Sequence, residues 1–216
     1  AELRHEMLLG FGEILHGAER TAWLVKLSDE VIPCQQHQGE TSLLKMMDEV
    51  FAWFHDFKDA QGHAAILKVM DHILHGQMLD IERFELGQNT RLTQDAELEE
   101  YCFLVAGCVG EFWTELGYIS LLGFSSIEAE RLKCMGINYG KGLQLINILR
   151  DLPSDLKQGR CYLPGVDSSD RDAMMVEAAR WRARARAYLS DGQVYAKSLK
   201  LRRTRAATAL PGLIGQ

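Results

Sequence analysis

In Gln144-Leu-Ile-Asn-Ile-Leu-Arg-Asp-Leu-Pro-Ser-Asp155, three oxygen-bearing side chains recur at four-residue intervals. They belong to Asn147, Asp151 and Asp155. An α-helix has about 3.6 residues per turn, so this spacing puts all three on one helix face, roughly 6 Å of rise apart. The residues between them are mostly apolar, which predicts a largely buried helix. Pro153 lacks an amide proton and is expected to kink or end that helix in its last turns.

Carboxylates are rarely buried without a partner that offsets their desolvation. A hard divalent cation is a natural partner, because Mg²⁺ binds one or two carboxylates and leaves its other positions to water and a phosphate. Arg150, Lys157 and Arg160 are close in sequence and could bind the same phosphate through charge-assisted hydrogen bonds. The alternative is an amphipathic helix with ordinary surface aspartates. The adjoining amide, the three cations and the Gly159–Pro164 segment favour the metal–phosphate site.

The composition fits one ordinary globular domain, and we expect residues 1–216 to form it. Hydrophobic residues make up 47% of the chain and charged residues 25%, so a sizeable core is available. The formal net charge of −6 argues against general nucleic-acid binding, and an anionic ligand would have to meet local cations. The five cysteines are scattered, with no Cys-x-x-Cys pair, which indicates free thiols in a reducing cytoplasm.

Apolar residues recur mainly at the helical period, with no convincing strand alternation, so the sequence predicts an all-α fold. Asp95 is expected to cap a long helix that carries Ala106, Gly107 and Gly110 in its middle. A glycine there costs roughly 1 kcal/mol compared with alanine, which indicates that another helix or a ligand approaches closely. The predicted helices cover residues 2–16, 21–27, 41–57, 64–86 and 95–122, followed by the motif-bearing helix after a capping box at Ser125–Glu128. A last helical region is predicted over 169–207.

Two other patterns have ordinary explanations. The arginines at 180, 182, 184 and 186 lack an accompanying aromatic ladder, so we expect a solvated face; contact with an anionic membrane surface or partner is the alternative. His72 and His75 lie near Asp71 at a spacing that could bind a metal. Without a third ligand at helical register, they are expected to be ordinary helix residues.

Several segments resemble signatures of the squalene/phytoene synthase family. Residues 144–155, with the following Gly159-Arg-Cys-Tyr-Leu-Pro164, are similar to the family's second aspartate-rich motif. The segment Glu97-Leu-Glu-Glu-Tyr-Cys-Phe-Leu-Val-Ala-Gly-Cys-Val-Gly110 is similar to the other family signature, and Gly76-Gln-Met-Leu-Asp80 resembles an upstream element. The segment Cys108-Val-Gly-Glu-Phe-Trp113 is most similar to the corresponding segment of bacterial squalene synthases.

The resemblance implies an isoprenoid-synthase helical bundle around a central apolar cavity, with aspartate motifs on opposing helices at its mouth. It implies Mg²⁺-dependent head-to-head condensation of two prenyl diphosphates, with farnesyl diphosphate as the expected substrate and NADPH as a candidate reductant. The resemblance also implies a cytoplasmic enzyme, with peripheral membrane contact as an option and no nucleic-acid partner. The expected Mg²⁺ ligands are Asn147, Asp151 and Asp155; the catalytic groups are Tyr101, Asp151 and Asp155; and the substrate-binding residues are Asp80, Val105, Ala106, Gly110, Gln144, Arg150, Arg160 and Tyr162.

The family's first aspartate-rich motif, Asp-x-x-x-Asp on an early helix, is not found. Asp29-Glu30 is followed by Val-Ile-Pro, and Asp48, Asp56 and Asp59 stand in a different context. The resemblance therefore implies an N-terminally incomplete domain, expected to be a fragment of a full synthase. A partner chain that supplies the missing helix and an inactive relative are the alternatives. For these residues alone we expect little turnover, because one metal-binding face would replace two.

Two further functions compete with a synthase. A non-catalytic helical module could keep the diphosphate site and act as a subunit or a relic of such an enzyme. A terpene cyclase also uses an amide and acids at four-residue spacing. The Gly159–Pro164 segment and the Val105–Gly110 helix favour the synthase over the cyclase.

Overall fold

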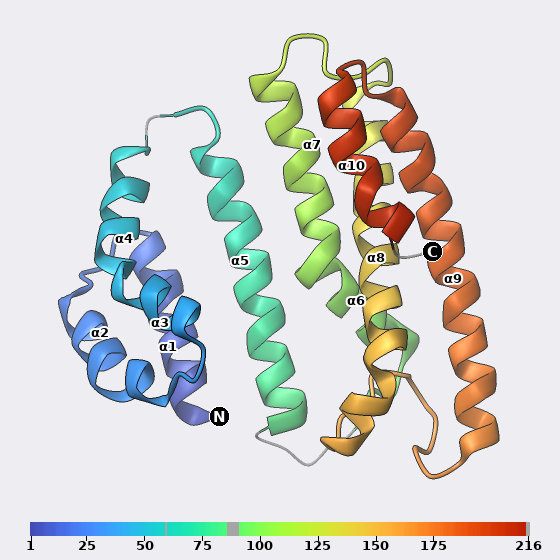
Figure 1. The fold of residues 1–216 in the computed structure, drawn as a ribbon, viewed down its shortest axis with the longest axis horizontal. Helices are drawn as coiled ribbons and strands as arrows, with labels where there is room; N and C mark the ends of the chain where they lie inside the picture. Colours follow the sequence, from blue (N-terminus) through green and yellow to red (C-terminus); the bar gives the residue numbers. More distant parts are fainter. Residues whose placement is uncertain (59, 86–90, 215–216) are drawn as a thin grey trace. The chain divides into compact units, whose positions relative to one another are not determined.

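The computed structural model describes residues 1–58, 60–85 and 91–214 and is all-α, as predicted (Figure 1). Asp59 and Leu86, which the sequence analysis names, lie outside these residues. The only β pairing among the described residues is two isolated bridges, Arg91 with Cys161 and Ser125 with Leu199. Contacts divide the chain into two compact units, Ala1–Leu74 and His75–Gln216, and each is described here by itself.

The N-terminal unit is built on an aromatic cluster. The rings of Phe11, Trp23 and Phe51 have centroids 5.4–6.1 Å apart, and Phe51 is almost fully buried. The predicted helix over 41–57 is wrong in one respect, because the chain turns at Met46, whose φ of −92° and ψ of 3° leave the helical region. The elements are α1 (Glu2–Leu15), α2 (Thr21–Lys26), η1 (Leu27–Val31), η2 (Ile32–Cys34), α3 (Gln38–Lys45), α4 (Met47–Asp56) and the first part of α5 (His63–Asp80).

The C-terminal unit is organised around one long helix, α8 (Ala129–Lys157), which packs against its neighbours on both sides (Figure 1). The helix continues through Pro153, so the proline does not end it. The remaining elements are η3 (Ile81–Glu85), α6 (Asp95–Cys102), η4 (Phe103–Gly107), α7 (Cys108–Ser120), α9 (Arg171–Ser198) and α10 (Arg202–Ile214).

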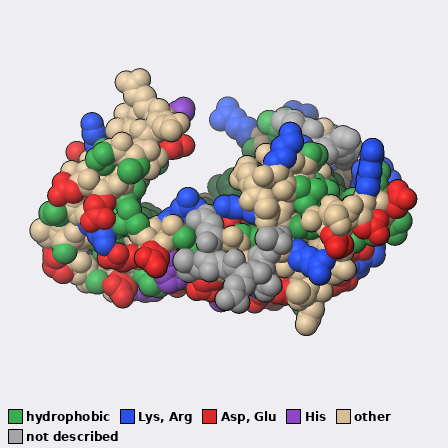
Figure 2. Space-filling view, turned by 90° about the horizontal axis from the view of Figure 1, so that it is seen from below, with side chains coloured by type: hydrophobic (Ala, Val, Ile, Leu, Met, Phe, Trp, Pro, Cys, Tyr) green, Lys and Arg blue, Asp and Glu red, His purple; other side chains and the backbone are tan. Residues whose placement is uncertain are grey.

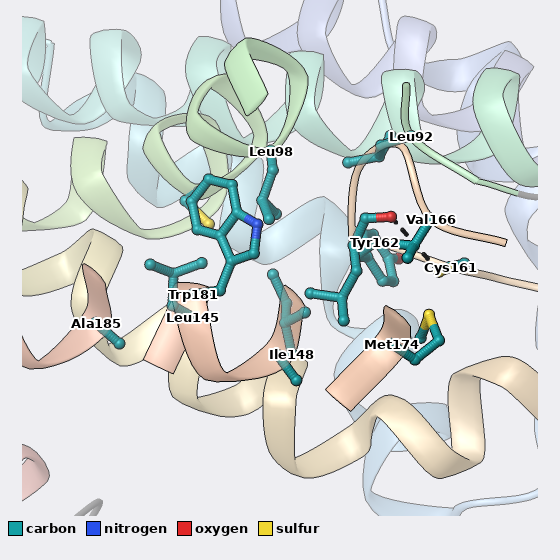
Figure 3. Close-up of a cluster of buried hydrophobic side chains, with 13 residues drawn as sticks. Leu92, Leu98, Leu145, Ile148, Cys161, Tyr162, Val166, Met174, Trp181 and Ala185 are labelled. Carbon is teal, nitrogen blue, oxygen red and sulfur yellow. Dashed lines mark hydrogen bonds between the residues drawn. The ribbon is translucent and has the colours of Figure 1, made fainter. Parts of the chain in front are cut away.

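The core of this unit lies between α8, α9 and the segment that follows α8. Trp181 of α9 is 2% exposed and lies among Leu98, Leu145 and Ile148 (Figure 3). Leu145 and Ile148 therefore turn the apolar face of α8 to the core, which leaves the intervening polar positions on other faces. On the face of this unit seen at the right of Figure 2, acidic, basic and apolar side chains are interspersed.

Two predicted helix starts are wrong by a few residues. The N-cap of α6 is Gln94 rather than Asp95, and the carboxylate of Glu97 accepts the Gln94 N–H at 2.8 Å. The N-cap of α8 is Glu128, whose carboxylate accepts the N–H groups of residues 130 and 131 at 3.0 and 3.1 Å. Ser125 instead accepts the N–H of Ile127. A glutamate carboxylate can accept hydrogen bonds from the free N–H groups at a helix start, as the shorter side chains of Ser, Thr and Asp do.

The predicted helical region over 169–207 consists of two helices, because the chain leaves the helical conformation at Leu199. There it forms an antiparallel bridge with Ser125, and the Lys200 N–H donates to the carbonyl of Phe124 at 3.0 Å. Leu199 is fully buried, so its apolar contacts and these backbone hydrogen bonds together stabilise the break more than another helical turn would stabilise the chain. A separate helix, α10, starts at Arg202.

The predicted helix over 95–122 extends from Asp95 to Ser120, but five residues in its middle, η4, form a wider π-helical turn. By length and composition this run is also the one helix, among the described residues, that could cross a bilayer. Core helices of other proteins satisfy the same criterion, and this run packs against α8.

Candidate active site

The site is built where η4 and α7 approach α8 through glycine. A Cβ atom added to Gly110 would lie 2.0 Å from the carbonyl oxygen of Gly136, and one added to Gly140 would lie 2.2 Å from that of Ala106. Such distances are far inside van der Waals contact, so no larger residue fits at either position. The small residues of the two sequence motifs therefore bring the two backbones together, which was one of the two roles expected for them.

An open cavity of 410 Å³ lies beside this contact, bounded by η4, α7, α8, α9 and α10. Its lining is mostly apolar, and two of its polar side chains, Gln144 and Asn147, lie about one turn apart on α8. The predicted residues that line it are Val105, Ala106, Gly110, Gln144 and Asn147. Sequence reasoning missed Trp113, Tyr139, Leu143, Tyr195, Thr208 and Pro211.

Some of these missed residues carry a sequence signal. Trp113 follows Gly110 by three positions, and Tyr139 and Leu143 stand on either side of Gly140, so helical spacing alone puts them near the same face. The contribution of α10 has no such signal. Tyr139 holds that helix in place, since its hydroxyl donates to the carbonyl of Thr208 and accepts the N–H of Gly212, both at 2.8 Å.

A second group of predicted residues meets around Asp80, at the C-terminal end of α5. The Tyr162 hydroxyl donates to the Asp80 carboxylate at 2.5 Å, and the Arg160 guanidinium donates to it at 3.2 Å. Tyr101 stacks on Tyr162 with ring centroids 5.1 Å apart. Burial, together with the Asp80 charge, raises the pKa of Tyr101 to about 12. Burial raises the pKa of Tyr162 as well, so both phenols are protonated at neutral pH and can donate hydrogen bonds.

Asp155 lies beside this group, where burial and the neighbouring carboxylates disfavour its charged form. Burial raises its pKa, and the charges of Asp151 and Asp80 add to the effect, while Arg160 opposes it. Asp151 has the opposite environment, because Arg150 donates two hydrogen bonds of 2.8 Å to its carboxylate and lowers its pKa. Asp155 is half-buried, whereas the Asp151 side chain is 48% exposed.

The predicted metal ligands thus share one face of α8 but differ in surroundings. Asn147 faces the cavity, Asp155 lies near Asp80, and Asp151 is paired with Arg150. No three His, Cys, Asp or Glu side chains in the described part of the chain converge closely enough to form a metal site on their own. Arg150 is 65% exposed and lines a different groove, between α8 and α9, rather than the apolar cavity.

One charged cluster was not predicted. Glu99 of α6 forms an ion pair with Lys141 of α8 and accepts hydrogen bonds from Tyr188 and Arg184 of α9. Burial raises the pKa of Glu99, but the hydrogen bonds from Lys141 and Tyr188 outweigh it and leave the pKa below its usual value. Glu99 precedes Tyr101 by two positions, so the cluster fixes the helix that carries Tyr101.

Comparisons with known proteins identify the family of this chain. The squalene/phytoene synthase profile matches residues 13–216. A phytoene synthase of Thermus thermophilus is 33% identical over 155 residues, which are 66% of this chain and 48% of that protein. A squalene synthase of Cyberlindnera jadinii is 30% identical over 131 residues, 59% of this chain and 28% of that protein. The aligned segments therefore span about half or less of these relatives.

The fold has a solved counterpart. The crystal structure of squalene synthase HpnC from Alicyclobacillus acidocaldarius superposes with a TM-score of 0.58, covering 99% of this chain and 91% of that one at 15% identity. At that identity the likeness concerns the fold. The family profile covers nearly the whole chain. The chain belongs to the squalene/phytoene synthase family.

Proposed function

We propose that this chain carries the second diphosphate site and part of the hydrocarbon cavity of a Mg²⁺-dependent enzyme that condenses two prenyl diphosphates head to head. Farnesyl diphosphate is the proposed substrate. The observation that carries the proposal is the continuity of the apolar cavity with Asn147, on the same face of α8 as Asp151 and Asp155. A ligand with a long hydrocarbon chain and an anionic head fits this arrangement, with the chain in the apolar cavity and the head at the polar face of α8.

The residues present fit Mg²⁺. The donor set, one amide and two carboxylates at four-residue spacing, consists of the hard oxygen ligands that Mg²⁺ prefers. Burial raises the pKa of Asp155, and the charges of Asp151 and Asp80 raise it further; a divalent cation would favour the charged carboxylate. Asn147, Asp151 and Asp155 would contribute ligands to Mg²⁺ bound along this face of α8, which would stabilise the charge on the departing diphosphate.

Other side chains would act on the substrate directly. Arg160 lies 3.2 Å from Asp80 and could donate to a diphosphate oxygen. Tyr101, protonated at neutral pH, could donate a hydrogen bond to the leaving group as its charge develops. The apolar wall of Val105, Ala106 and Leu143 would keep water from a reactive carbocation.

The test is binding of a farnesyl thiodiphosphate analogue, measured by calorimetry with and without Mg²⁺. We expect Mg²⁺-dependent binding that Asp155→Asn weakens by about tenfold or more, because hydrogen bonds and ligands that involve a charge contribute roughly 1.5–3 kcal/mol. Glu130→Gln is the matched control, since Glu130 is an exposed carboxylate in the first turn of the same helix. Binding that is independent of Mg²⁺, or equally weakened by both substitutions, would overturn the proposal.

Turnover is a separate readout. Incubation with farnesyl diphosphate and Mg²⁺, with and without NADPH, should be analysed for presqualene diphosphate, squalene and hydroxysqualene. Product formation supports the complete reaction in this chain. Tight Mg²⁺-dependent binding without product supports the non-catalytic or subunit alternative.

A further inference from the structure

A groove of 640 Å³ between α8 and α9 is separate from the apolar cavity described above. Its α8 wall consists of Ile146, Leu149 and Arg150, which lie on a different face of that helix from Gln144 and Asn147. On α9, the lining residues are Arg182, Ala185, Arg186, Leu189, Ser190 and Gln193. The proposed condensation uses neither Arg182 nor Arg186.

The groove combines guanidinium groups with a hydrocarbon floor. Ala185 and Leu189 are buried, and Ile146 and Leu149 are partly buried against the core, so the floor is apolar. Its two α9 arginines are exposed. The lining contains no Asp or Glu and no aromatic ring. A bound group would therefore meet positive charge at the rim and methyl groups beneath.

Two of the three arginines are available for a ligand. Arg150 is engaged by Asp151, whereas Arg182 and Arg186 have no ion pair or hydrogen bond within the described part of the chain. They stand four residues apart on one face of α9, so a single anion can bridge them. The chain as a whole has a net charge of −6, which makes this unneutralised pair a local feature rather than a result of composition.

The same face of α9 also presents an apolar side chain to solvent. Met175 precedes Arg182 by seven residues, which is two helical turns, and is 63% exposed. Exposed cations beside an exposed apolar side chain are the combination that favours the headgroup region of an anionic bilayer. A soluble phosphate would use the guanidinium groups but would gain nothing from the apolar floor or from Met175.

We propose that this groove is a docking site for anionic phospholipid at a membrane surface. Arg182 and Arg186 bind the lipid phosphate, while Ile146, Leu149 and Leu189 contact the upper part of an acyl chain. The site stands on the groove and its charges alone, so it can be correct even if the proposed condensation is not.

The test is co-sedimentation of the full 216-residue chain with lipid vesicles. We expect binding to phosphatidylcholine vesicles that contain phosphatidylglycerol, and little binding to phosphatidylcholine alone. Each cation near an anionic surface is worth roughly a fivefold change in partitioning, so Arg182→Gln with Arg186→Gln should lower it about 25-fold. The matched control is Arg202→Gln with Arg203→Gln, which replaces two exposed arginines of α10 and changes the net charge equally. Its effect on vesicle binding should be several-fold smaller.

Further variants keep the test decisive. Arg182→Lys with Arg186→Lys preserves charge and should retain most of the binding, and Met175→Gln should weaken it several-fold without a change of charge. Circular dichroism should match the unaltered chain in every variant, and a pair that fails to fold is replaced by the single substitutions. The proposal is overturned if the unaltered chain does not bind anionic vesicles, if both arginine pairs matter equally, or if inorganic phosphate at equal ionic strength displaces the chain.

Discussion

The hydroxyl of Tyr162 donates a 2.5 Å hydrogen bond to the carboxylate of Asp80, which lies 82 positions earlier in the sequence. Only 13% of the Asp80 side chain is exposed, and its other partner is Arg160. The pair joins the end of α5 to the segment that follows α8. Two motifs that are distant in sequence thus form one polar cluster at the edge of the core.

Replacing Tyr162 by Phe should destabilise the C-terminal unit by about 1.5–3 kcal/mol, since hydrogen bonds to charged groups contribute that much. Urea unfolding followed by circular dichroism measures the loss. The control is Tyr118→Phe, which removes a hydroxyl that donates to the neutral carbonyl of Ile127 and should cost about 1 kcal/mol. Equal losses in the two variants would mean that the charge of Asp80 contributes nothing to the bond.

Replacing Gly110 by Ala should separate α7 from α8, because the new Cβ would lie 2.0 Å from the Gly136 carbonyl oxygen. We expect a loss of at least about 2 kcal/mol in the free energy of unfolding. Gly12→Ala is the control, since its Cβ would meet only a leucine methyl at 3.2 Å, which can move. Gly12→Ala should change the free energy of unfolding by no more than about 1 kcal/mol, because the higher helix propensity of alanine offsets the contact. A tolerated Gly110→Ala would contradict the close packing.

The cluster around Glu99 predicts a dependence of stability on pH. The folded-state pKa of Glu99 is lowered, so its contribution is complete above the ordinary value of about 4.3 and is lost as the pH falls through the folded-state value. At neutral pH, Glu99→Gln should cost about 1–3 kcal/mol, because Lys141 loses its partner.

The difference between Glu99→Gln and the unaltered chain should shrink in acid, where both side chains are neutral. Chemical unfolding at several pH values measures it. Glu100→Gln is the neighbouring control, because Glu100 is 50% exposed and pairs with Arg83 at the surface. A pH-independent penalty for Glu99→Gln would show that shape rather than charge is involved.

Trp113 lines the cavity and is 41% exposed, so it should report on occupancy by fluorescence. Addition of a prenyl thiodiphosphate analogue should shift its emission to shorter wavelength as water leaves the ring. Trp113→Phe should abolish the shift, and Trp53→Phe, which removes an exposed ring of the N-terminal unit, should leave it unchanged. A shift that persists without Trp113 would locate the ligand elsewhere.

The helical fold class and the family follow from sequence because they rest on local signals. The glycines of α7 and α8 stand at helical spacing, and structure and family profile both confirm the prediction. The family resemblance also named part of the cavity wall, including Gly110 and Gln144, but not Trp113, Tyr139 or Leu143. The catalytic role of Tyr101 and the metal-binding roles of Asn147 and Asp155 stay predictions, of which Asp155→Asn tests the last.

The features that sequence did not reveal depend on distant partners. The helical region predicted over 169–207 is interrupted at Leu199, because the segment around Ser125, far away in the chain, offers backbone hydrogen bonds there. The α10 wall of the cavity depends in the same way on the hydroxyl of Tyr139. Arg150 turns toward Asp151, its immediate neighbour, and no periodicity distinguishes that geometry from one directed at a ligand.

The wide turn η4 has a consequence for how the chain tolerates change in length. Along an uninterrupted α-helix, Tyr101 and Gly110 would point in nearly opposite directions, at about 100° per residue. The additional residue held in a π-turn rotates the downstream half by roughly a quarter of a revolution. Deleting one residue between Phe103 and Gly107 would therefore rotate α7 about its axis relative to α6. The stacking of Tyr101 on Tyr162 and the close contact of Gly110 with α8 could then no longer form together.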